Sequence, residues 1–98
     1  MARLDLAFRR RAEADLDDVL AFGVQRFGHE VGLNYARGLR DSCELLRDFP
    51  KMAPVAPRTR RPTRVLHHRS HRVFYRVEPT RVLIVRILHH ARDTPSAL

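Results

Sequence analysis

The chain of 98 residues has a single cysteine, Cys43, no tryptophan and no long apolar run. One cysteine excludes an internal disulfide, and a membrane-spanning helix would need about 20 predominantly apolar residues. The first residues also lack the apolar stretch of a signal peptide. These absences favour a cytoplasmic protein without a membrane segment, and the length allows one domain with one modest core.

Acidic residues are scarce in the second half of the chain. Residues 1–53 hold nine Lys or Arg and nine Asp or Glu, whereas residues 54–98 hold ten Arg and two acids, Glu78 and Asp93. The whole net charge of +8 therefore falls in residues 54–98, which also contain five of the six histidines. Codon bias accounts for the preference for Arg over Lys, but not for the missing acids. A field of one sign suits an anionic partner, either nucleic acid or an acidic protein segment.

Apolar periodicity predicts the order β-α-α-β-β-β. The pattern divides residues 1–98 into a strand, two helices, a Pro- and Arg-rich connection, and three further strands. In chain order these segments cover residues 3–8, 11–27, 29–48, 50–63, 64–69, 71–78 and 81–89. Short links make the helices an antiparallel hairpin and the last three strands an antiparallel meander. We therefore expect a single α+β domain, with the helical hairpin packed on a small antiparallel sheet.

Each predicted helix carries an apolar stripe that should face the core. The first stripe starts at Ala12 and ends at Phe27, and Gly28 is a natural end for that helix. The second stripe includes Tyr35 and Cys43. We therefore predict that Cys43 is a core residue rather than a nucleophile.

Three arginines lie inside the predicted strands. Arg72 and Arg76 share one face of the 71–78 strand with Phe74, and Arg86 interrupts the otherwise apolar last strand. Because an unpaired arginine is costly to bury, we expect these three arginines to reach an open face of the sheet. Arginine beside histidine can hold phosphates and move a proton, as a metal-free ribonuclease requires, or it can dock an acidic peptide. A solvated face is the third interpretation.

The histidines form adjacent pairs, His67–His68 and His89–His90. Adjacent residues on a strand point to opposite faces, so neither pair can close on one ion from a regular strand. With no second thiol or acidic group nearby, we expect no metal site, and the sequence indicates no other cofactor.

Five segments, taken in order, resemble the ParE toxins of the RelE/ParE superfamily. They are residues 11–16, 35–46, 49–52, 73–77 and 87–93. The last segment, which ends His-x-Ala-Arg-Asp, is the most specific. The resemblance implies the RelE/ParE toxin fold and a growth-inhibiting toxin of a bacterial type II toxin–antitoxin module. ParE toxins typically poison DNA gyrase and are neutralised in a complex with a small, usually ParD-like, antitoxin whose tail we expect to be acidic. RelE toxins instead cleave messenger RNA in the ribosome.

The resemblance favours the ParE branch, because RelE-type nucleases carry a C-terminal catalytic tyrosine and this chain has no tyrosine after Tyr75. On this interpretation no catalytic residue is assured. Contacts to gyrase are expected at Arg86, His89, His90, Arg92 and Asp93. Contacts to the antitoxin are expected at Arg64, Arg72, Phe74 and Arg76.

Two alternatives stay open. The first is a ribosome-dependent messenger RNA endonuclease that would use Arg72 together with His89, His90 or Arg92. The second is a basic adaptor protein without toxicity.

Overall fold

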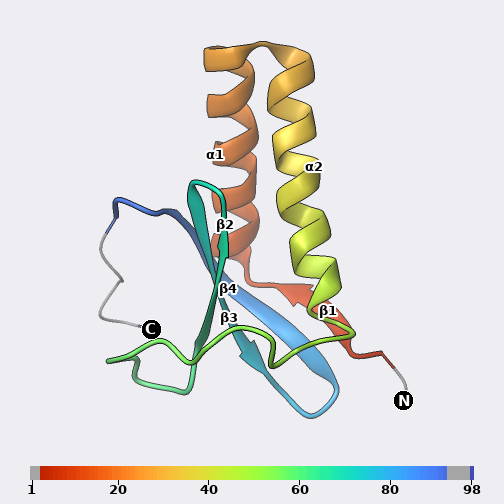
Figure 1. Cartoon of the computed structure of the whole chain (residues 1–98), viewed down its shortest axis with the longest axis vertical. Helices are drawn as coiled ribbons and strands as arrows, with labels where there is room; N and C mark the ends of the chain where they lie inside the picture. The colour runs from red at the N-terminus through yellow and green to blue at the C-terminus, as the bar shows by residue number, and fades with distance from the viewer. Residues whose placement is uncertain (1–2, 93–97) are drawn as a thin grey trace.

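A computed structural model of the chain describes residues 3–92 and 98. This part of the chain forms two helices and four strands (Figure 1). In chain order they are β1 (Asp5–Phe8), α1 (Arg10–Phe27), α2 (His29–Leu45), β2 (Arg64–His68), β3 (His71–Val77) and β4 (Arg81–His89). The α+β class and the predicted order of elements are confirmed. The second helix is shorter than predicted, because it ends at Leu45 and residues 46–48 form a turn.

The sheet is mixed rather than wholly antiparallel. Its strand order is β1-β4-β3-β2, and β2, β3 and β4 form the predicted antiparallel meander. The first strand instead runs parallel to β4, with Asp5 opposite Arg81 and Phe8 opposite Ile84. The expectation of an antiparallel sheet was therefore wrong for β1. The hairpin, connection and meander that separate β1 from β4 are long enough for the crossover that a parallel pair needs.

Both faces of the sheet are buried, each by different parts of the chain. The helix-facing core joins residues of the hairpin to residues of the sheet: Ala12, Leu39, Cys43, Leu46, Val73, Tyr75, Val82, Ile84 and Ile87. Burial raises the pKa of the Cys43 thiol to about 12, as expected for a core cysteine without nucleophilic character. A smaller cluster on the other face, here called the second face, is covered by Ala56 of the connection and by Leu98.

A β-bulge in β4 decides which side chains reach which face. One step along β3, from Phe74 to Tyr75, corresponds to two steps along β4, which leaves Val85 as the extra residue. Strict alternation would place Ile87 on the same face as Val85. Because the bulge shifts the alternation by one residue, Ile87 packs in the helix-facing core and Leu88 packs on the second face.

The far half of the hairpin extends beyond the sheet (Figure 1). There the two helices come into backbone contact, since a Cβ added to Gly23 would lie 3.2 Å from the Cα of Gly32. Gly28 joins the helices with a φ of 94°, a conformation that favours glycine. Because none of the strands formed by residues 3–92 reaches this part of the hairpin, Phe27 is exposed, and the prediction that it faces the core was wrong.

Candidate functional site

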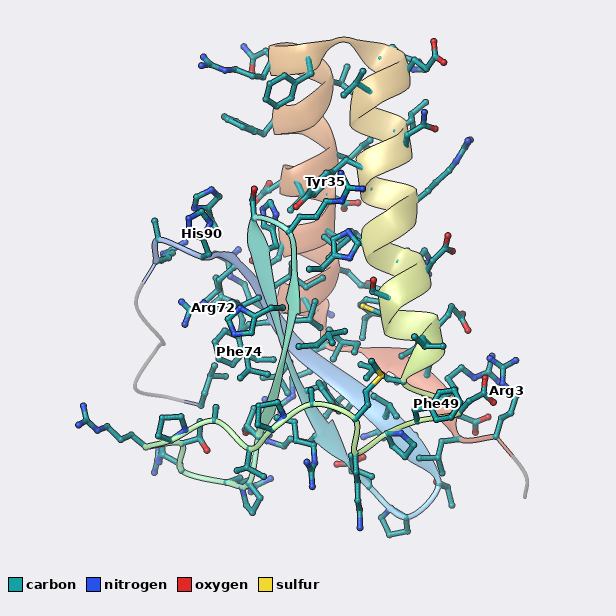
Figure 2. The ribbon with its side chains drawn as sticks, viewed as in Figure 1. Arg3, Tyr35, Phe49, Arg72, Phe74 and His90 are labelled. Carbon is teal, nitrogen blue, oxygen red and sulfur yellow. The ribbon has the colours of Figure 1, made fainter. Side chains whose placement is uncertain are left out.

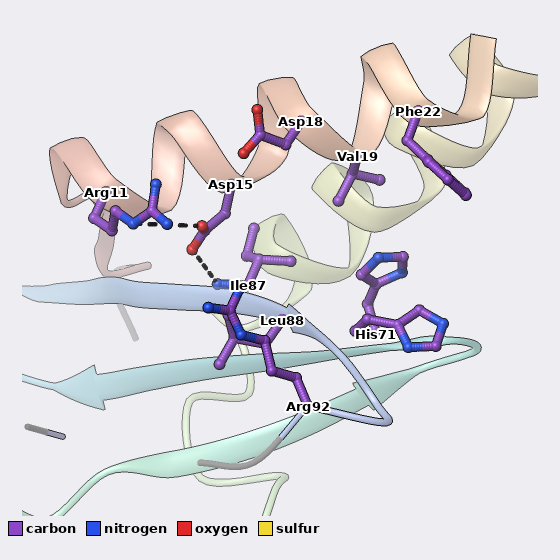
Figure 3. A pocket seen from close by; sticks show the side chains of 10 residues that line it. Arg11, Asp15, Asp18, Val19, Phe22, His71, Ile87, Leu88 and Arg92 are labelled. Atoms are coloured by element: carbon purple, nitrogen blue, oxygen red, sulfur yellow. Dashed lines mark hydrogen bonds and ion pairs between the residues drawn. The ribbon is translucent and has the colours of Figure 1, made fainter. Parts of the chain in front are cut away.

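A groove, here called the hairpin groove, runs along α1 between the hairpin and the ends of the strands. Its wider part, about 630 Å³, lies between the hairpin and the β2–β3 turn. Its narrower part, about 400 Å³, lies between α1 and the end of β4 (Figure 3). Both parts are lined by Val19, Phe22, His71 and His89. The groove is therefore continuous, with apolar side chains from α1 on one wall and histidines from the strands on the other.

The apolar wall carries large side chains that solvent reaches. Phe22 is 63% exposed, and Phe27 and Val31 are also exposed around the end of the hairpin. Charged side chains line the same groove: Arg69 in the wider part, and Arg11 and Arg92 together with Asp15 and Asp18 in the narrower part. An exposed apolar surface bordered by basic residues is typical of a surface that binds another protein.

Asp15 of α1 fixes one end of this groove. Its carboxylate accepts hydrogen bonds from Nε and Nη2 of Arg86, at 2.8 and 3.2 Å, and from the backbone N–H of Ile87 at 2.9 Å. Arg11 lies 3.9 Å away as a further ion-pair partner (Figure 3). β1 pairs with β4 only as far as Ile84, so Asp15 satisfies an N–H group that lies beyond the end of β1. The carboxylate thereby joins α1 to the C-terminal part of β4.

Arg86 does not reach an open face, contrary to the expectation from sequence. Its side chain is 15% exposed and is held by Asp15, which is 5% exposed. Arg86 bonds Asp15 of α1 just beyond the last residue at which β1 pairs with β4, and the buried carboxylate supplies the partner that its burial requires. Arg86 is therefore placed to position the end of β4, behind the surface of the groove.

A tyrosine and a histidine hold the opposite wall. Tyr35 Oη lies 2.7 Å from Nδ1 of His71 and accepts a hydrogen bond from the backbone N–H of Ser70 at 3.3 Å. The ring of His71 makes an edge contact with the ring of His89, with centroids 5.5 Å apart. Burial, and then the neighbouring histidines 89, 68 and 90, lower the pKa of His71 to about 4. His71 is therefore neutral at physiological pH, and its Nδ1 either accepts a hydrogen bond from Tyr35 Oη or donates one to it, depending on the tautomer.

The end of β4 and the segment after it lie at the narrow part of the groove. His89 and Arg92 line it, and His89 Nδ1 accepts a hydrogen bond from the N–H of Ala91 at 3.2 Å. The ring of His90 packs against His89, and its Nδ1 lies 3.0 Å from the carbonyl oxygen of Ser70. The structure thus brings three of the predicted gyrase contacts to one end of the sheet. Asp93, predicted with them, lies outside the described residues.

Three of the predicted antitoxin contacts, Arg72, Phe74 and Arg76, lie on the second face, whereas Arg64 shares the helix-facing side with Tyr75. Arg72 stacks over the ring of Phe74, 5.2 Å from its centroid, and donates a hydrogen bond to the carbonyl of Arg92 (Figure 2). Arg64 donates to the carbonyl of Ala53 at 2.6 Å. Phe74 and Arg76 are buried, contrary to the expectation that Arg76 reaches an open face. Their burial follows from the second layer that the connection and Leu98 build over this face.

The potential nuclease set is divided between the two faces. His89 and Arg92 line the groove, whereas the side chain of Arg72 packs on the second face. Within residues 3–92 and 98, no three His, Cys, Asp or Glu side chains converge as metal ligands. No helix of this part of the chain is long and apolar enough to cross a membrane.

Sequence reasoning missed several residues of the groove. Neither Asp15 nor Phe22 stands out in the sequence, although Asp15 is buried and Phe22 is exposed. Arg86 was a signal for a buried acid such as Asp15, because an arginine between apolar neighbours in a central strand needs a carboxylate partner. The signal for Phe22 was absent, since only the structure reveals that the hairpin outreaches the sheet.

Comparisons with known proteins agree with this architecture. Residues 6–94 match the family described as the ParE toxin of the type II toxin–antitoxin system, parDE. Toxin ParE1 of Caulobacter vibrioides is 39% identical over 89 residues, which are 91% of this chain and 92% of the relative. In a solved structure of the chromosomal ParDE TA system from P. aeruginosa, a chain superposes with a TM-score of 0.76 at 23% identity, covering 89% of this chain and 96% of that one.

A second solved structure, a copper-bound mutant toxin from Helicobacter pylori, superposes with a TM-score of 0.56 at 18% identity, covering 90% of this chain and 96% of that one. At these identities the two structures show a shared fold. The family match and the Caulobacter relative extend over almost the whole chain. This chain therefore belongs to the ParE toxin family of type II toxin–antitoxin systems.

Proposed function

We propose that this chain inhibits bacterial growth by binding and poisoning DNA gyrase in the cytoplasm, and that a ParD-like antitoxin holds it inactive. Membership of the ParE family supports a toxin that pairs with an antitoxin. The observation that carries the proposal is the hairpin groove, where Phe22 is 63% exposed beside Phe27 and Val31. An apolar groove of this kind suits an amphipathic segment of a partner protein.

The charges around the groove favour an acidic partner segment. Arg69 and Arg92 line the groove, and Arg64 and Arg72 lie on the sheet beyond it. An antitoxin segment would place apolar side chains against Phe22 and acidic side chains toward these arginines. The acidic tail would then continue toward Arg64 and Arg72, while Phe74 and Arg76 would support that face from beneath. Its association rate should therefore fall as salt concentration rises.

Two matched phenylalanines test where the antitoxin binds. Phe22 in the groove and Phe49 after α2 are 63% and 59% exposed, so replacing either by alanine removes a similar solvent-exposed ring. We expect Phe22→Ala to weaken antitoxin binding by roughly thirtyfold or more, as a central apolar anchor does. Phe49→Ala should leave the affinity within about threefold of wild type. Equal effects in isothermal titration calorimetry would place the antitoxin elsewhere.

We assign gyrase contact to the end of β4 and the segment after it. His89, His90 and Arg92 lie together at one end of the sheet, and Asp93 follows directly in the sequence. Arg86 would act indirectly, because its bonds to Asp15 hold this end of β4 against α1. The antitoxin and gyrase would then compete for neighbouring parts of one groove.

A supercoiling assay with purified gyrase tests this target. We expect wild-type protein to block supercoiling and trap cleaved DNA, and Arg92→Gln to lose most of that effect. Arg37→Gln, the same change at an exposed position of α2, is the matched control. Gyrase that keeps full activity with no trapped cleavage complexes would remove gyrase as the target. Expression without the antitoxin should arrest growth, and unimpaired growth would favour a non-toxic adaptor.

One observation favours a second candidate, a ribosome-dependent endoribonuclease. Tyr35 Oη and His71 Nδ1 lie 2.7 Å apart beside His89, in a groove that Arg92 also lines. A hydroxyl, imidazoles and a guanidinium are groups that can transfer a proton and stabilise a phosphorane. Primer extension on translated messages after induction decides between the two candidates. Cleavage in codon register by the wild-type protein that disappears in Tyr35→Phe and His89→Gln would favour the nuclease. If the wild-type protein produces no such cleavage, the nuclease candidate is discarded.

A further inference from the structure

A second pocket lies between α2 and the β2–β3 turn, next to the wider part of the hairpin groove. It has a volume of about 280 Å³ and is lined by Val31, Asn34, Tyr35, Gly38, His68 and Arg69. We call this space the His68 pocket. Val31, Tyr35 and Arg69 also line the groove, so the two spaces share one border. The volume suits one side chain of a partner protein rather than a whole small-molecule ligand.

A hydrogen bond and a ring contact hold His68 at the wall of this pocket. Its Nδ1 lies 2.7 Å from Oγ of Ser42, and its ring makes an edge contact with the ring of Tyr35, with centroids 5.7 Å apart. Nε2 lies beside Gly38, because a Cβ added to that glycine would be 3.7 Å from Nε2. Burial lowers the pKa of His68 below its ordinary value, and the charge of Arg69 lowers it further, so the ring is neutral at physiological pH. When Ser42 donates to Nδ1, the ring's proton is on Nε2, which is then a hydrogen-bond donor beside Gly38.

Two residues of the pocket are unfavourable choices for their local structure. Gly38 is inside α2, where glycine destabilises a helix relative to alanine, and an added Cβ would make only an ordinary contact. Arg69 has a φ of 50°, a conformation that favours glycine or asparagine. Local exceptions of this kind cluster at functional sites, where the site retains them at the expense of stability. These two residues provide open space beside Nε2 of His68 and a guanidinium at the turn.

The charge and the donors around the pocket favour a carboxylate ligand. Arg69 supplies a positive charge, and neither it nor another lining residue is paired with an acid in the part of the chain that the structure describes. The amide of Asn34 and Nε2 of His68 add neutral donors, and one guanidinium balances a single negative charge. Val31 is exposed and Tyr35 is half-buried, so both offer apolar contact to the methylene groups of an acidic side chain.

We infer that the His68 pocket binds an aspartate or glutamate side chain of the protein segment that lies in the hairpin groove. The inference rests on the proposed binding of an antitoxin in that groove. Because Val31, Tyr35 and Arg69 border both spaces, a segment with apolar side chains in the groove can place a carboxylate in the pocket without leaving the surface. The pocket thereby selects partners that carry an acid at that position.

Titration of the purified full-length chain with a blocked tetraglutamate peptide tests the pocket without the antitoxin. Tetraglutamine is the neutral arm, inorganic phosphate is the third arm, and chloride keeps the ionic strength constant. We expect saturable shifts of the His68 ring resonances in NMR spectra at millimolar tetraglutamate, and none with tetraglutamine. The same spectra report the tautomer of His68. The proton should be on Nε2 in wild type, whereas in Ser42→Ala part of the population should carry it on Nδ1.

Two variants that keep the fold separate a binding role from a structural one. Arg69→Gly should melt at the same or a higher temperature, since glycine suits the φ of 50°, and should weaken tetraglutamate binding roughly tenfold. Gly38→Ala should also melt no lower, and its methyl group beside Nε2 of His68 should weaken binding roughly fivefold. Arg37→Gln removes an equal charge from an exposed position of α2 and should bind the peptide within about twofold of wild type.

Calorimetry with the antitoxin distinguishes this inference from the proposed function. Arg69→Gly and Gly38→Ala should weaken antitoxin binding by factors similar to those for the peptide. If Phe22→Ala weakens tight antitoxin binding while both pocket variants leave it unchanged, the inference fails and the proposed function stands. If the antitoxin does not bind at all, the proposed function fails, and the tetraglutamate titration alone decides whether the pocket binds a carboxylate.

Three results of the peptide titration would overturn the inference. The first is the absence of saturable tetraglutamate binding. The second is an equal affinity for tetraglutamine, which would indicate contacts that do not depend on the charge. The third is tighter binding of inorganic phosphate than of tetraglutamate, which would indicate a phosphate site.

Discussion

Replacing Asp15 by asparagine should destabilise the protein far more than an ordinary change on a helix surface. The carboxylate is 5% exposed and accepts two hydrogen bonds from Arg86 and one from the N–H of Ile87. Asparagine keeps one acceptor oxygen, which can still serve the N–H of Ile87. The negative charge is lost, however, and Arg86 stays behind at 15% exposure without its partner.

The magnitude follows from what is left unpaired. Breaking a fully buried ion pair from one side costs about 3–5 kcal/mol. Arg86 keeps partial access to water, so we expect Asp15→Asn to lower the free energy of unfolding by about 2–3 kcal/mol. Asp15→Ala also removes the acceptor for Ile87, which should add about 1–2 kcal/mol. The matched control is Asp17→Asn on the exposed side of α1, with an expected change within about 0.5 kcal/mol.

Urea unfolding followed by circular dichroism measures these changes, because the chain has no tryptophan to report them. A double-mutant cycle with Arg86→Met isolates the pair, and we expect a coupling energy of about 2 kcal/mol. A loss below about 1 kcal/mol for Asp15→Asn, or a coupling energy near zero, would refute the assignment of Asp15 as the anchor of β4.

Two further predictions concern the hairpin and the groove. Gly32→Ala should destabilise the fold by about 3 kcal/mol, because a Cβ there would collide with the backbone of Val24. Gly38→Ala should instead be neutral or stabilising by about 0.5–1 kcal/mol, because its Cβ would lie 3.7 Å from the His68 ring, an ordinary contact distance. Thermal melts of both variants check this pair. The pKa of His71 is lowered from 6.5 to about 4 in the folded chain, so its contribution to stability is full above pH 6.5 and is lost as the pH falls toward 4. Between pH 7 and pH 4 the free energy of unfolding, measured with urea, should fall by about 1–2 kcal/mol less in His71→Gln than in wild type, a figure reduced because solvent reaches the ring. An equal fall in both proteins would contradict the lowered pKa of His71.

Local patterns were sufficient for the order of elements. The spacing of Ala12 and Tyr35 in their stripes, and the glycine at position 28, predicted a helical hairpin because these signals act within a few residues. Cys43 could be placed in the core for the same reason. The direction of β1 was not predictable in this way, since it depends on a pairing with β4 across more than 70 residues.

The faces of β4 depended on one feature that periodicity cannot reveal. The bulge at Val85 exchanges the faces of every later residue, so Ile87 enters the helix-facing core and His89 comes beside His71. Arg86 is held by Asp15 of α1 and does not reach solvent as expected. The sequence contained both partners of this ion pair, 71 residues apart, but no local signal joined them.

The length of the hairpin links the fold to binding. α1 has 18 residues and thus spans about 27 Å, whereas the sheet covers only its first half (Figure 1). A helix pair without a sheet beneath it would ordinarily be mobile, but the contact between Gly23 and Gly32 packs the two backbones together at that level. The apolar stripe continues onto this rigid extension and leaves Phe22 and Phe27 in solvent. A chain that fixes exposed phenylalanines in place retains a surface that favours aggregation unless a partner covers it. The hairpin is therefore best explained as a preformed half of an interface, whose other half an antitoxin would supply.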